Sequence, residues 1–366
     1  MSNGDAMVKD AEAAPVWIER QLRSLLQQRG HAWLLAGPSG LGQYHLGLEL
    51  VRAWLCDQPL VDGSGKKGIG GEGEEGGHGS EEGARTGACG VCQSCHAIDV
   101  RAHTDLLVLM PETLMLELGW PLSEETQKKI DDKERKPSKE IRVEALRDAV
   151  EFSQRTSGRG RGKAVLVYPA ERMNAISANT LLKTLEEPPG ELKFVLASES
   201  AHQLLPTIRS RCLGHAMHWP STLEATDWLT GQGLSAAQAA TLLRASGGRP
   251  HDARDYFAQG LQPAAWEAIP KAMQRGDLSA FKDWTAPQVV DALHKLCHDL
   301  ISVKNGALPR FFAPASLPLP AKSPRGLDLW AKSLTATRRT VEHPFNAGLM
   351  LESLVAEAKT ALNSAH

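Results

Sequence analysis

A stretch of eight residues near the amino terminus constrains the fold of this 366-residue chain more than any other. The segment Gly37–Tyr44, with the sequence GPSGLGQY, follows the short apolar run Trp33–Ala36 and opens a helical pattern. Its glycines, Gly37, Gly40 and Gly42, allow backbone N–H groups to curl around a phosphate, and the N-terminus of a helix favours the phosphate's negative charge. The pattern predicts a buried strand, a phosphate-binding loop and a helix, and hence an α/β domain.

The loop lacks both side chains that act on a nucleotide. A working loop of this type places a lysine on the β- and γ-phosphates and a serine or threonine on magnesium, but this chain has Gln43 and Tyr44 there. Glutamine has no charge to offer, and the phenol of tyrosine cannot replace a short hydroxyl on the metal. A glycine-rich strand–helix turn without any nucleotide role is the alternative, and the loop alone does not decide between them.

A second position in the chain shows the same loss. ATPases of this architecture end a later strand in an acidic pair, one carboxylate for magnesium and one for the attacking water. The corresponding strand, residues 163–167, ends in Tyr168-Pro169. Two separate positions have lost the same chemistry, which indicates a former ATPase and predicts that this chain does not hydrolyse ATP.

Strands and helices alternate over roughly the first 215 residues, which indicates a mainly parallel sheet covered on both faces. From about residue 221 onward the pattern is only that of helices. Residues 62–87, rich in glycine and glutamate, and the charged residues 127–139 are predicted to be mobile loops because they offer little apolar surface to bury. The expected helices are 17–26, 44–56, 141–150 and 175–185, and the expected strands are 33–36, 164–167 and 194–197.

Three cysteines, Cys89, Cys92 and Cys95, are spaced closely enough to ligate one metal ion, which needs a fourth ligand. Four thiolates suit structural zinc. An iron–sulfur or redox site is the alternative, although the fourth cysteine and the proline typical of such runs are absent. We expect Cys212 and Cys297 to be small buried side chains.

The composition excludes some classes of function. A net charge of −2 and an isoelectric point near 6.7 argue against a protein that binds nucleic acid over its whole surface. The sequence has no apolar run of membrane-spanning length and does not begin with a secretory signal, so we expect a cytoplasmic protein with no membrane contact. A local basic cluster, Arg155, Arg159, Arg161 and Lys163, could meet DNA phosphates, but a solvated turn is the more common explanation.

Three further stretches complete a resemblance to a known family. They are residues 31–37 (HAWLLAG), 179–189 (NTLLKTLEEPP) and 209–212 (RSRC). Together with the altered loop they resemble the AAA+ clamp-loader subunits of bacterial DNA polymerase III, and among these the delta-prime family, whose own ATPase site is inactive. The resemblance covers about residues 17–212.

The resemblance implies roles for particular residues. Arg211, with Ser210, would form the motif whose arginine acts in trans on the ATP of a neighbouring subunit, as an arginine finger. A surface ion pair is the alternative role for this arginine. The family's zinc module implies Cys56 as the fourth metal ligand, with His96 as the stand-in, and places the module at residues 56–95.

The resemblance also implies an architecture. We expect an AAA+ α/β domain with a parallel sheet and an inserted zinc module, followed by an all-helical lid and an all-helical collar that mediates oligomerisation. The insertions at 57–88 and 111–138 receive no role. The expected boundaries are a disordered tail at 1–14, the α/β domain at 15–215, the lid at 216–258 and the collar at 259–366.

The implied function is that of a component of the DNA polymerase III holoenzyme, a DNA-directed DNA polymerase, with no enzymatic activity of its own. The implied partners are the gamma/tau and delta subunits in a hetero-oligomer and, through that complex, the sliding clamp and primer–template DNA during DNA replication. Two rival functions remain open: an active gamma/tau-like ATPase, and a zinc-dependent DNA-binding protein that forms no ring.

Overall fold

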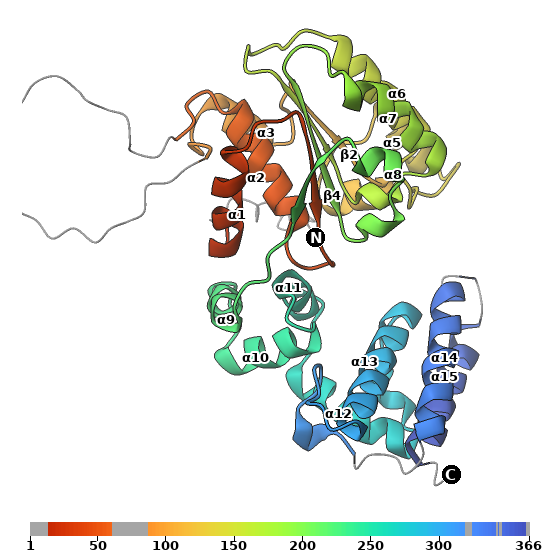
Figure 1. The fold of residues 1–366 in the computed structure, drawn as a ribbon. Coiled ribbons are helices and arrows are strands. Elements are labelled where there is room, and N and C mark those ends of the chain that lie inside the picture. The colour runs from red at the N-terminus through yellow and green to blue at the C-terminus, as the bar shows by residue number, and fades with distance from the viewer. Residues whose placement is uncertain (1–13, 61–86, 319–323, 342, 344–345, 364–366) are drawn as a thin grey trace, which may run out of the picture. The chain divides into compact units, whose positions relative to one another are not determined.

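The computed structural model describes residues 14–60, 87–318, 324–341, 343 and 346–363. The chain forms two compact units that divide between Trp219 and Pro220. The first unit is α/β, and the described part of the second contains helices and no strand (Figure 1). The predicted tail and nearly all of the predicted glycine-rich loop lie outside the described residues.

The first unit is built on a five-stranded sheet in the order β2-β3-β4-β1-β5. Every neighbouring pair is parallel, as in the register of Leu35 with Ala197 of β4 and His215 of β5. The predicted parallel sheet is therefore confirmed. The strands are β1 (Ala32–Ala36), β2 (Leu106–Leu109), β3 (Lys163–Val167), β4 (Leu192–Ser198) and β5 (Leu213–Ala216).

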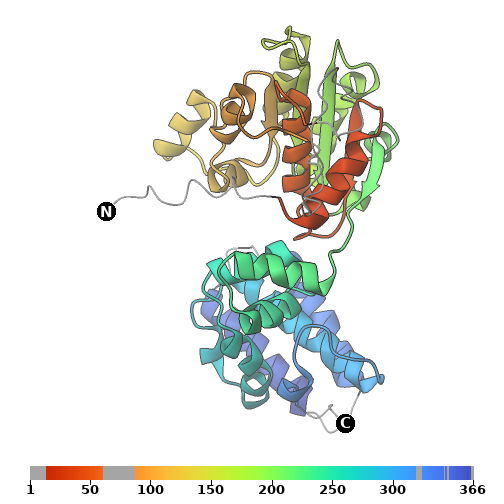
Figure 2. The same cartoon turned by 90° about the vertical axis from the view of Figure 1, so that its left-hand side faces the viewer.

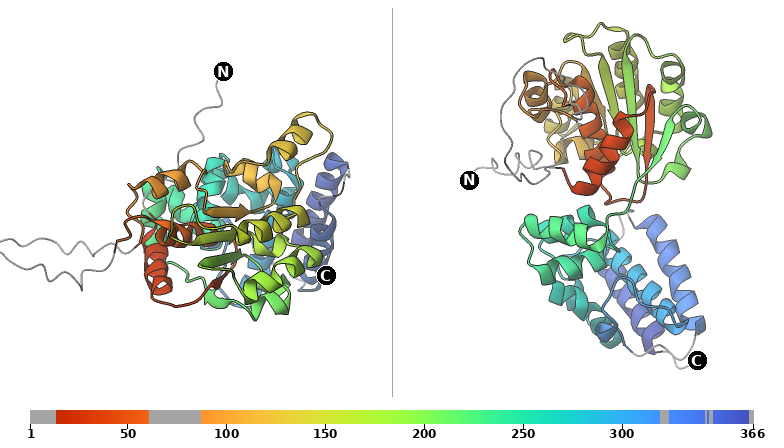
Figure 3. Two further views of the ribbon diagram at one scale, coloured as in Figure 1. Left: turned by 90° about the horizontal axis from the view of Figure 1, so that it is seen from above. Right: turned by 60° about the vertical axis from the view of Figure 1, so that its left-hand side comes forward.

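Helices cover both faces of this sheet, with α1, α2 and α3 on one side and α6, α7 and α8 on the other (Figures 1 and 3). On the second side, Leu34 and Val165 of the sheet join Leu146 of α6 and Leu181 of α7 in one buried cluster. The helices are α1 (Val16–Leu26), α2 (Gln43–Leu55), α3 (Gln93–Asp99), α4 (Glu112–Glu117), α5 (Glu124–Asp131), α6 (Val143–Gln154), α7 (Ala175–Glu186) and α8 (Pro206–Arg209), with 3₁₀ turns η1 (Ala170–Arg172) and η2 (Ala201–Gln203).

Helix α2 lies close against the sheet because of Gly47. A Cβ atom at this position would lie 2.8 Å from the Leu166 side chain and 3.2 Å from that of Val195, so any larger residue would push the helix away. In a parallel α/β unit a helix that follows a strand begins at the carboxyl edge of the sheet and runs back along it. Helix α2 therefore has its first turn at that edge and its last turn near the opposite edge.

The charged segment 127–139 is not the mobile loop that its composition predicted. Its first part belongs to α5, Glu124–Asp131. The hydroxyl of Ser123 caps this helix at its N-terminus, and Lys129 pairs with Glu125 one turn earlier at 2.5 Å. A cap and a favourable charge pair thus order a helix that has no buried side chain.

The edge strand β2, Leu106–Leu109, was not predicted. Its sequence, LLVL, is a four-residue apolar run without alternation, a pattern that does not distinguish a strand from part of a buried helix. Its partner is β3, and it forms one edge of the sheet. The segment 111–138 follows it, coloured orange to yellow at one side of the first unit in Figure 2.

The second unit holds two buried apolar clusters. One is formed by α9, α10 and α11 and the other mainly by α12 to α15, and Tyr256 and Leu261 pack against both. No helix of the described residues is both long enough and apolar enough to cross a membrane. The helices are α9 (Thr222–Gly231), α10 (Ala236–Ala245), α11 (Pro250–Ala258), α12 (Pro263–Arg275), α13 (Ala286–Lys304), α14 (Pro324–Thr340) and α15 (Ala347–Asn363), with 3₁₀ turns η3 (Leu278–Phe281) and η4 (Pro314–Ser316).

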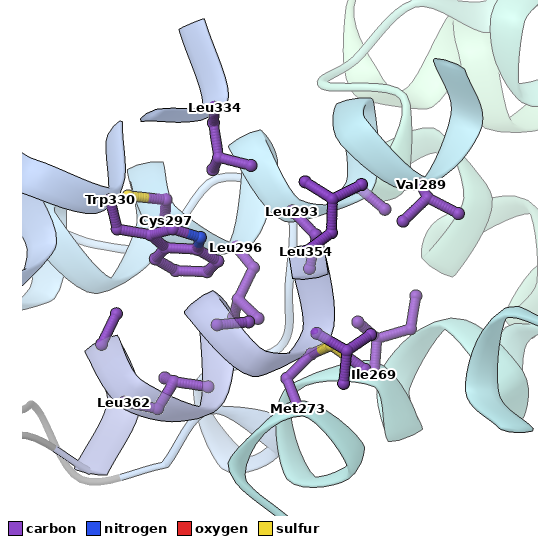
Figure 4. Packing of buried hydrophobic residues seen from close by; sticks show 14 of the residues in the cluster. Ile269, Met273, Val289, Leu293, Leu296, Cys297, Trp330, Leu334, Leu354 and Leu362 are labelled. Carbon is purple, nitrogen blue, oxygen red and sulfur yellow. The ribbon is translucent and has the colours of Figure 1, made fainter. Parts of the chain in front are cut away.

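The larger of these clusters is a close-packed helical core. Figure 4 shows Leu296 of α13, Trp330 of α14 and Leu354 of α15 converging, and none of the three is more than 3% exposed. Burying a large apolar side chain contributes about 1.5–3 kcal/mol relative to leaving it in water. The helices predicted for this region thus pack around a hydrophobic core of their own.

Candidate functional site

The glycine-rich turn Gly37–Tyr44 joins β1 to α2 at the carboxyl edge of the sheet, the edge where open α/β proteins bind their ligands. Gly40 and Gly42 have φ angles of 75° and 91°, which are left-handed values that other residues rarely adopt. The backbone N–H of Gly37 donates to the carbonyl of Ser198 on β4, at 3.2 Å. The local backbone therefore has the strand–turn–helix context predicted from the sequence.

The Gln43 side chain binds its own loop. It is 2% exposed, and its amide nitrogen donates to the carbonyls of Gly37 at 2.8 Å and Pro38 at 2.6 Å. These bonds satisfy two carbonyl groups of the turn and fix the amide beneath it. Gln43 stands at the position where a working loop carries lysine. Its side chain is hydrogen-bonded within its own loop, and it brings no positive charge to a phosphate.

Tyr44 belongs to an aromatic cluster beside the turn. It is 4% exposed, and its hydroxyl accepts a hydrogen bond from the indole N–H of Trp120 at 2.8 Å. Its ring centroid lies 5.5 Å from that of Tyr168, and the Arg101 guanidinium lies 4.7 Å above the Trp120 ring. The indole comes from the segment 111–138, so that insertion contributes directly to the surroundings of the turn.

Tyr168, at the end of β3, extends this network to the end of β4. Its hydroxyl donates to a carboxylate oxygen of Glu199 at 2.7 Å. Glu171 accepts hydrogen bonds from the Ser198 hydroxyl at 2.8 Å and from the backbone N–H of Glu199 at 3.0 Å. The polar groups at the ends of β3 and β4 are therefore bonded to one another.

Arg211 follows helix α8 and lies near the end of α7. Its guanidinium donates to the carbonyl of Thr207 at 2.7 Å and forms an ion pair with Glu186. The hydroxyl of Ser210 also donates to Thr207, at 3.2 Å. The arginine side chain is 28% exposed and the Glu186 side chain 50% exposed. This is the intrachain ion pair that the sequence left as the alternative, and the trans role stays a prediction.

The four cysteines come together at the far end of α2. Cys56 directly follows that helix, while Cys89, Cys92 and Cys95 come from the segment around α3. The Sγ atom of Cys56 lies 3.5 Å from that of Cys89, 3.8 Å from that of Cys92 and 3.7 Å from that of Cys95, and all four sulfurs are within 4.8 Å of one another. His96 is exposed and does not belong to this group.

These distances fit a tetrahedral metal site. Zinc bound by four thiolates at about 2.3 Å places its sulfurs about 3.8 Å apart. Three backbone N–H groups also point at sulfurs: that of Cys89 at Cys56, that of Cys92 at Cys89 and that of Cys95 at Cys92, at 3.3–3.4 Å. Such donors stabilise negative charge on thiolates. The side chains present therefore fit a metal ion held by Cys56, Cys89, Cys92 and Cys95.

The insertion between Cys56 and Cys89 does not separate them, because its two ends are joined. Leu60 and Gly87 form an antiparallel bridge with two backbone hydrogen bonds, at 2.8 and 3.2 Å. This bridge explains how a cysteine 33 positions earlier in the chain reaches the triplet.

Three thiols of the cluster, those of Cys56, Cys89 and Cys95, have shifted pKa values. The backbone N–H of Val91 lowers the pKa of Cys89 to about 7, and burial raises the pKa values of Cys56 and Cys95. A metal ion would deprotonate all of them on binding. Outside the cluster, burial raises the pKa of Cys212 to about 11 and that of Cys297 to about 12. Cys297 is buried as predicted, whereas Cys212 is only partly buried.

The predicted basic cluster is divided in the structure. Lys163 is 6% exposed, and its ammonium group donates to carbonyls at the end of α6, including that of Ser153 at 3.0 Å. Arg155 pairs with Glu151 at 2.5 Å. Lys163 is therefore a structural residue and is removed from any surface that could contact DNA.

Asp57 and Asp105 connect the loop that carries Arg159 to the rest of the unit. Asp105 is 2% exposed and accepts the backbone N–H of Arg159 at 2.9 Å. Asp57, next to Cys56, accepts the hydroxyl of Ser94 at 2.7 Å and lies 3.8 Å from the Arg159 guanidinium. Sequence reasoning missed both aspartates, since single carboxylates between motifs carry no recognisable pattern.

The arrangement defines a class of protein. A parallel sheet with a phosphate-loop-like turn at its carboxyl edge, followed by a helical carboxy-terminal region, makes this an α/β protein of the open parallel-sheet class. Residues 78–218 match the model of a family described as "DNA polymerase III, delta subunit". A DNA polymerase III gamma subunit-related protein from Thermotoga maritima superposes with a TM-score of 0.46 at 15% identity, over 95% of this chain and 100% of that one.

The sequence relatives are more specific. The DNA polymerase III subunit delta' of Pseudomonas aeruginosa is 33% identical over 238 residues, which cover 64% of this chain and 58% of that protein. The subunit delta' of Escherichia coli is 29% identical over 313 residues, covering 81% of this chain and 79% of the relative. The tau subunit of Escherichia coli is 29% identical over 183 residues, which are 50% of this chain and 21% of tau. The chain is thus similar to the delta' subunits of DNA polymerase III, and it spans 58% of the Pseudomonas aeruginosa relative's length.

Proposed function

We propose that this chain is a clamp-loader subunit that does not hydrolyse ATP itself and acts within DNA polymerase III during DNA replication. The observation that carries the proposal is the Gln43 amide, which is bonded to two carbonyls of its own loop. Tyr44, Tyr168 and Trp120 pack beside that loop and supply no ligand for magnesium. This geometry disfavours an active gamma/tau-like ATPase.

The partners follow from the relatives. We infer a hetero-oligomer with gamma/tau and delta subunits that acts on the sliding clamp and primer–template DNA in the cytoplasm. The test is to mix the purified chain with tau and delta from its own organism and to measure the complex by size-exclusion chromatography with mass detection. A stoichiometric complex is expected, together with no ATP turnover by the chain alone. Turnover by the isolated chain, or a chain that binds DNA without joining tau, would support one of the rival functions instead.

We propose that Arg211 is the arginine finger for a neighbouring subunit, with Ser210 as part of its motif. A guanidinium group is always charged, and its donor fork fits phosphate oxygens. The ion pair with Glu186 is partly exposed, so breaking it costs only about 0.2–1 kcal/mol. A phosphate in a neighbouring site could therefore displace the carboxylate.

The finger can be tested in the assembled complex. Arg211→Ala should lower hydrolysis at the adjoining ATPase site on the order of 10³-fold, without change in assembly. Glu186→Gln is the matched control because it breaks the same ion pair but keeps the arginine, and it should retain activity. Equal losses in both variants would mean that the ion pair, and not the arginine's charge, is what matters.

We propose that the four cysteines hold structural zinc. All four ligand positions are occupied by protein sulfurs, which leaves no open position for a substrate. The ion would supply charge neutralisation and a crosslink between the end of α2 and the segment around α3. We likewise propose that the cluster of α9–α11 corresponds to the lid at 216–258 and that of α12–α15 to the oligomerising collar at 259–366, a division supported by the two apolar clusters, which share only a few bordering residues.

A further inference from the structure

The segment 111–138, which has no role in the proposed function, forms a groove along the edge strand of the sheet. The groove has a volume of about 560 Å³. All four residues 107–110 line it, and the opposite walls come from the segment 111–138 and from α6. This size is within the range of about 300–1,000 Å³ typical of protein binding sites.

One wall of the groove consists of unpaired backbone. The carbonyls of Asp105 and Leu109 accept N–H groups from β3, at 2.9 and 3.0 Å. Because backbone groups alternate in direction along a strand, those of Val108 point away from β3. Among the described residues no further strand pairs with β2, and no hydrogen bond from outside the sheet reaches the N–H or carbonyl of Val108. The outward N–H of Leu106 donates to the carbonyl of His103 at 3.2 Å, so the outward groups of Val108, a residue 7% exposed, are those in β2 with which an added strand would pair.

The charges in the groove are unbalanced. Its three basic residues are engaged: Arg135 and Arg142 with Glu112, at 2.5 and 3.4 Å, and Lys129 with Glu125. Three exposed carboxylates along the groove have no ion-pair partner among the described residues. They are Glu140, Glu144 and Asp148.

The two carboxylates on α6 and the Val108 side chain lie on different faces of the sheet. Glu144 and Asp148 are one turn apart on α6, the helix that packs on the side of the sheet where Leu109 lies. Val108, next to Leu109 in β2, also lines the groove, and its side chain points to the opposite face because successive side chains alternate. A strand added to β2 would direct alternate side chains to the two faces of the sheet. Basic residues would thus meet α6, and apolar residues would meet the opposite side.

We propose that the edge of β2 is a docking site for an extended segment of a partner protein in which basic and apolar residues alternate. Main-chain hydrogen bonds to Val108 would provide affinity, and the carboxylates of α6 would select the basic residues. A strand without basic residues would leave these carboxylates without ion-pair partners. The carboxylates therefore also disfavour pairing of this edge with the β2 strand of a second copy.

The test uses the full-length chain and a fluorescein-labelled octapeptide of alternating lysine and valine. Binding should raise its fluorescence anisotropy and weaken with salt, and hydrogen exchange should show new protection at the amides of Val108 and Met110. The double variant Glu144→Lys/Asp148→Lys should weaken binding about tenfold, since exposed pairs contribute about 0.2–1 kcal/mol each and reversed charges repel. Glu352→Lys on α15 makes the same charge change on the other unit and should leave binding unchanged.

Two further peptides separate strand pairing from charge alone. An alternating glutamate–valine octapeptide should not bind, and a lysine–valine peptide with proline at its two central positions should bind much less because proline has no N–H to donate. Equal binding of the proline peptide, absence of protection at Val108, or self-association of the chain at this edge in place of peptide binding would each overturn the proposal.

Discussion

The two ends of helix α2 carry the two candidate ligand sites of the first unit, and they differ in what their polar groups do. At the amino end, the Gln43 amide is bonded to its own loop and the Tyr44 hydroxyl to Trp120. At the carboxyl end, Cys56 joins three other cysteines at distances that fit a metal ion. The polar side chains at the amino end are hydrogen-bonded within the protein, whereas the sulfurs at the carboxyl end are arranged to bind a metal ion.

This difference shows how a glycine-rich turn can retain its backbone conformation without the side chains that bind a nucleotide. Gly37 stays necessary for packing, since a Cβ atom there would lie 2.7 Å from the Cβ of Met217. The backbone of the turn therefore serves the fold whether or not a nucleotide binds. The cysteine cluster differs in this respect, because two of its four side chains, Cys89 and Cys92, are only partly buried and the four sulfurs share a common centre that fits a metal ion.

The largest expected effect is at the metal end. Cys92→Ser should abolish zinc binding, measured as zinc per chain by atomic emission, and should lower the free energy of unfolding. With free zinc a thousand-fold above its dissociation constant, the bound ion contributes about 4 kcal/mol. Cys212→Ser, outside the cluster, should keep one zinc per chain. Purified wild-type protein with no bound metal would contradict the metal site at the carboxyl end of α2.

A somewhat smaller effect is expected at the amino end. Gln43→Ala leaves the carbonyls of Gly37 and Pro38 without their donor, and each lost hydrogen bond has a net value of about 0.5–1.5 kcal/mol. Urea unfolding followed by circular dichroism should show a loss of about 1–3 kcal/mol. Gln93→Ala, at an exposed position, is the control. A change below 0.5 kcal/mol, roughly the weakest value expected for one hydrogen bond, would mean that the amide does not hold the loop.

Trp120→Phe should have a milder effect, since it keeps most of the aromatic packing and removes only the N–H donor to Tyr44. The expected loss of stability is about 1 kcal/mol, the typical net value of one hydrogen bond. Trp330→Phe in the second unit is the matched substitution, because the indole N–H of Trp330 is buried without a hydrogen-bond partner. Equal losses in the two variants would indicate that ring packing, and not the bond to Tyr44, is the cause.

The smallest effect is expected from shortening the insertion in the zinc module. Replacing residues 61–86 with Asn-Gly would connect Leu60 to Gly87 by a two-residue hairpin turn, which their antiparallel bridge allows. The zinc content should stay at about one per chain, the stoichiometry of a four-thiolate site. Loss of zinc in the shortened chain would show that the insertion takes part in the site.

Much of the first unit could be predicted because its patterns are local. The apolar run before Gly37 predicted β1, and the apolar spacing of residues 17–26 predicted α1, which spans Val16–Leu26. The pattern failed for β2, a four-residue run, and for α5, where side-chain charge pairs order a helix with no apolar face. The identity of β2 depends on its distant partner β3, whereas α5 depends on a local cap and a local charge pair that a prediction from composition does not take into account.

By itself, the sequence determined the strand–turn–helix order around Gly37–Tyr44, the presence of Gln43 and Tyr44 where a working loop has lysine and serine or threonine, and the triplet of cysteines. Only the tertiary structure decided that Gln43 binds its own loop, that Trp120 reaches Tyr44 from 76 positions away, and that Cys56 completes the cluster. The physical reason is that residue types and spacings set local chemistry, whereas a contact between distant residues depends on how helices and strands pack. At the amino end of α2, that packing places the side chains where they hydrogen-bond within the protein. At the carboxyl end, it brings four sulfurs together.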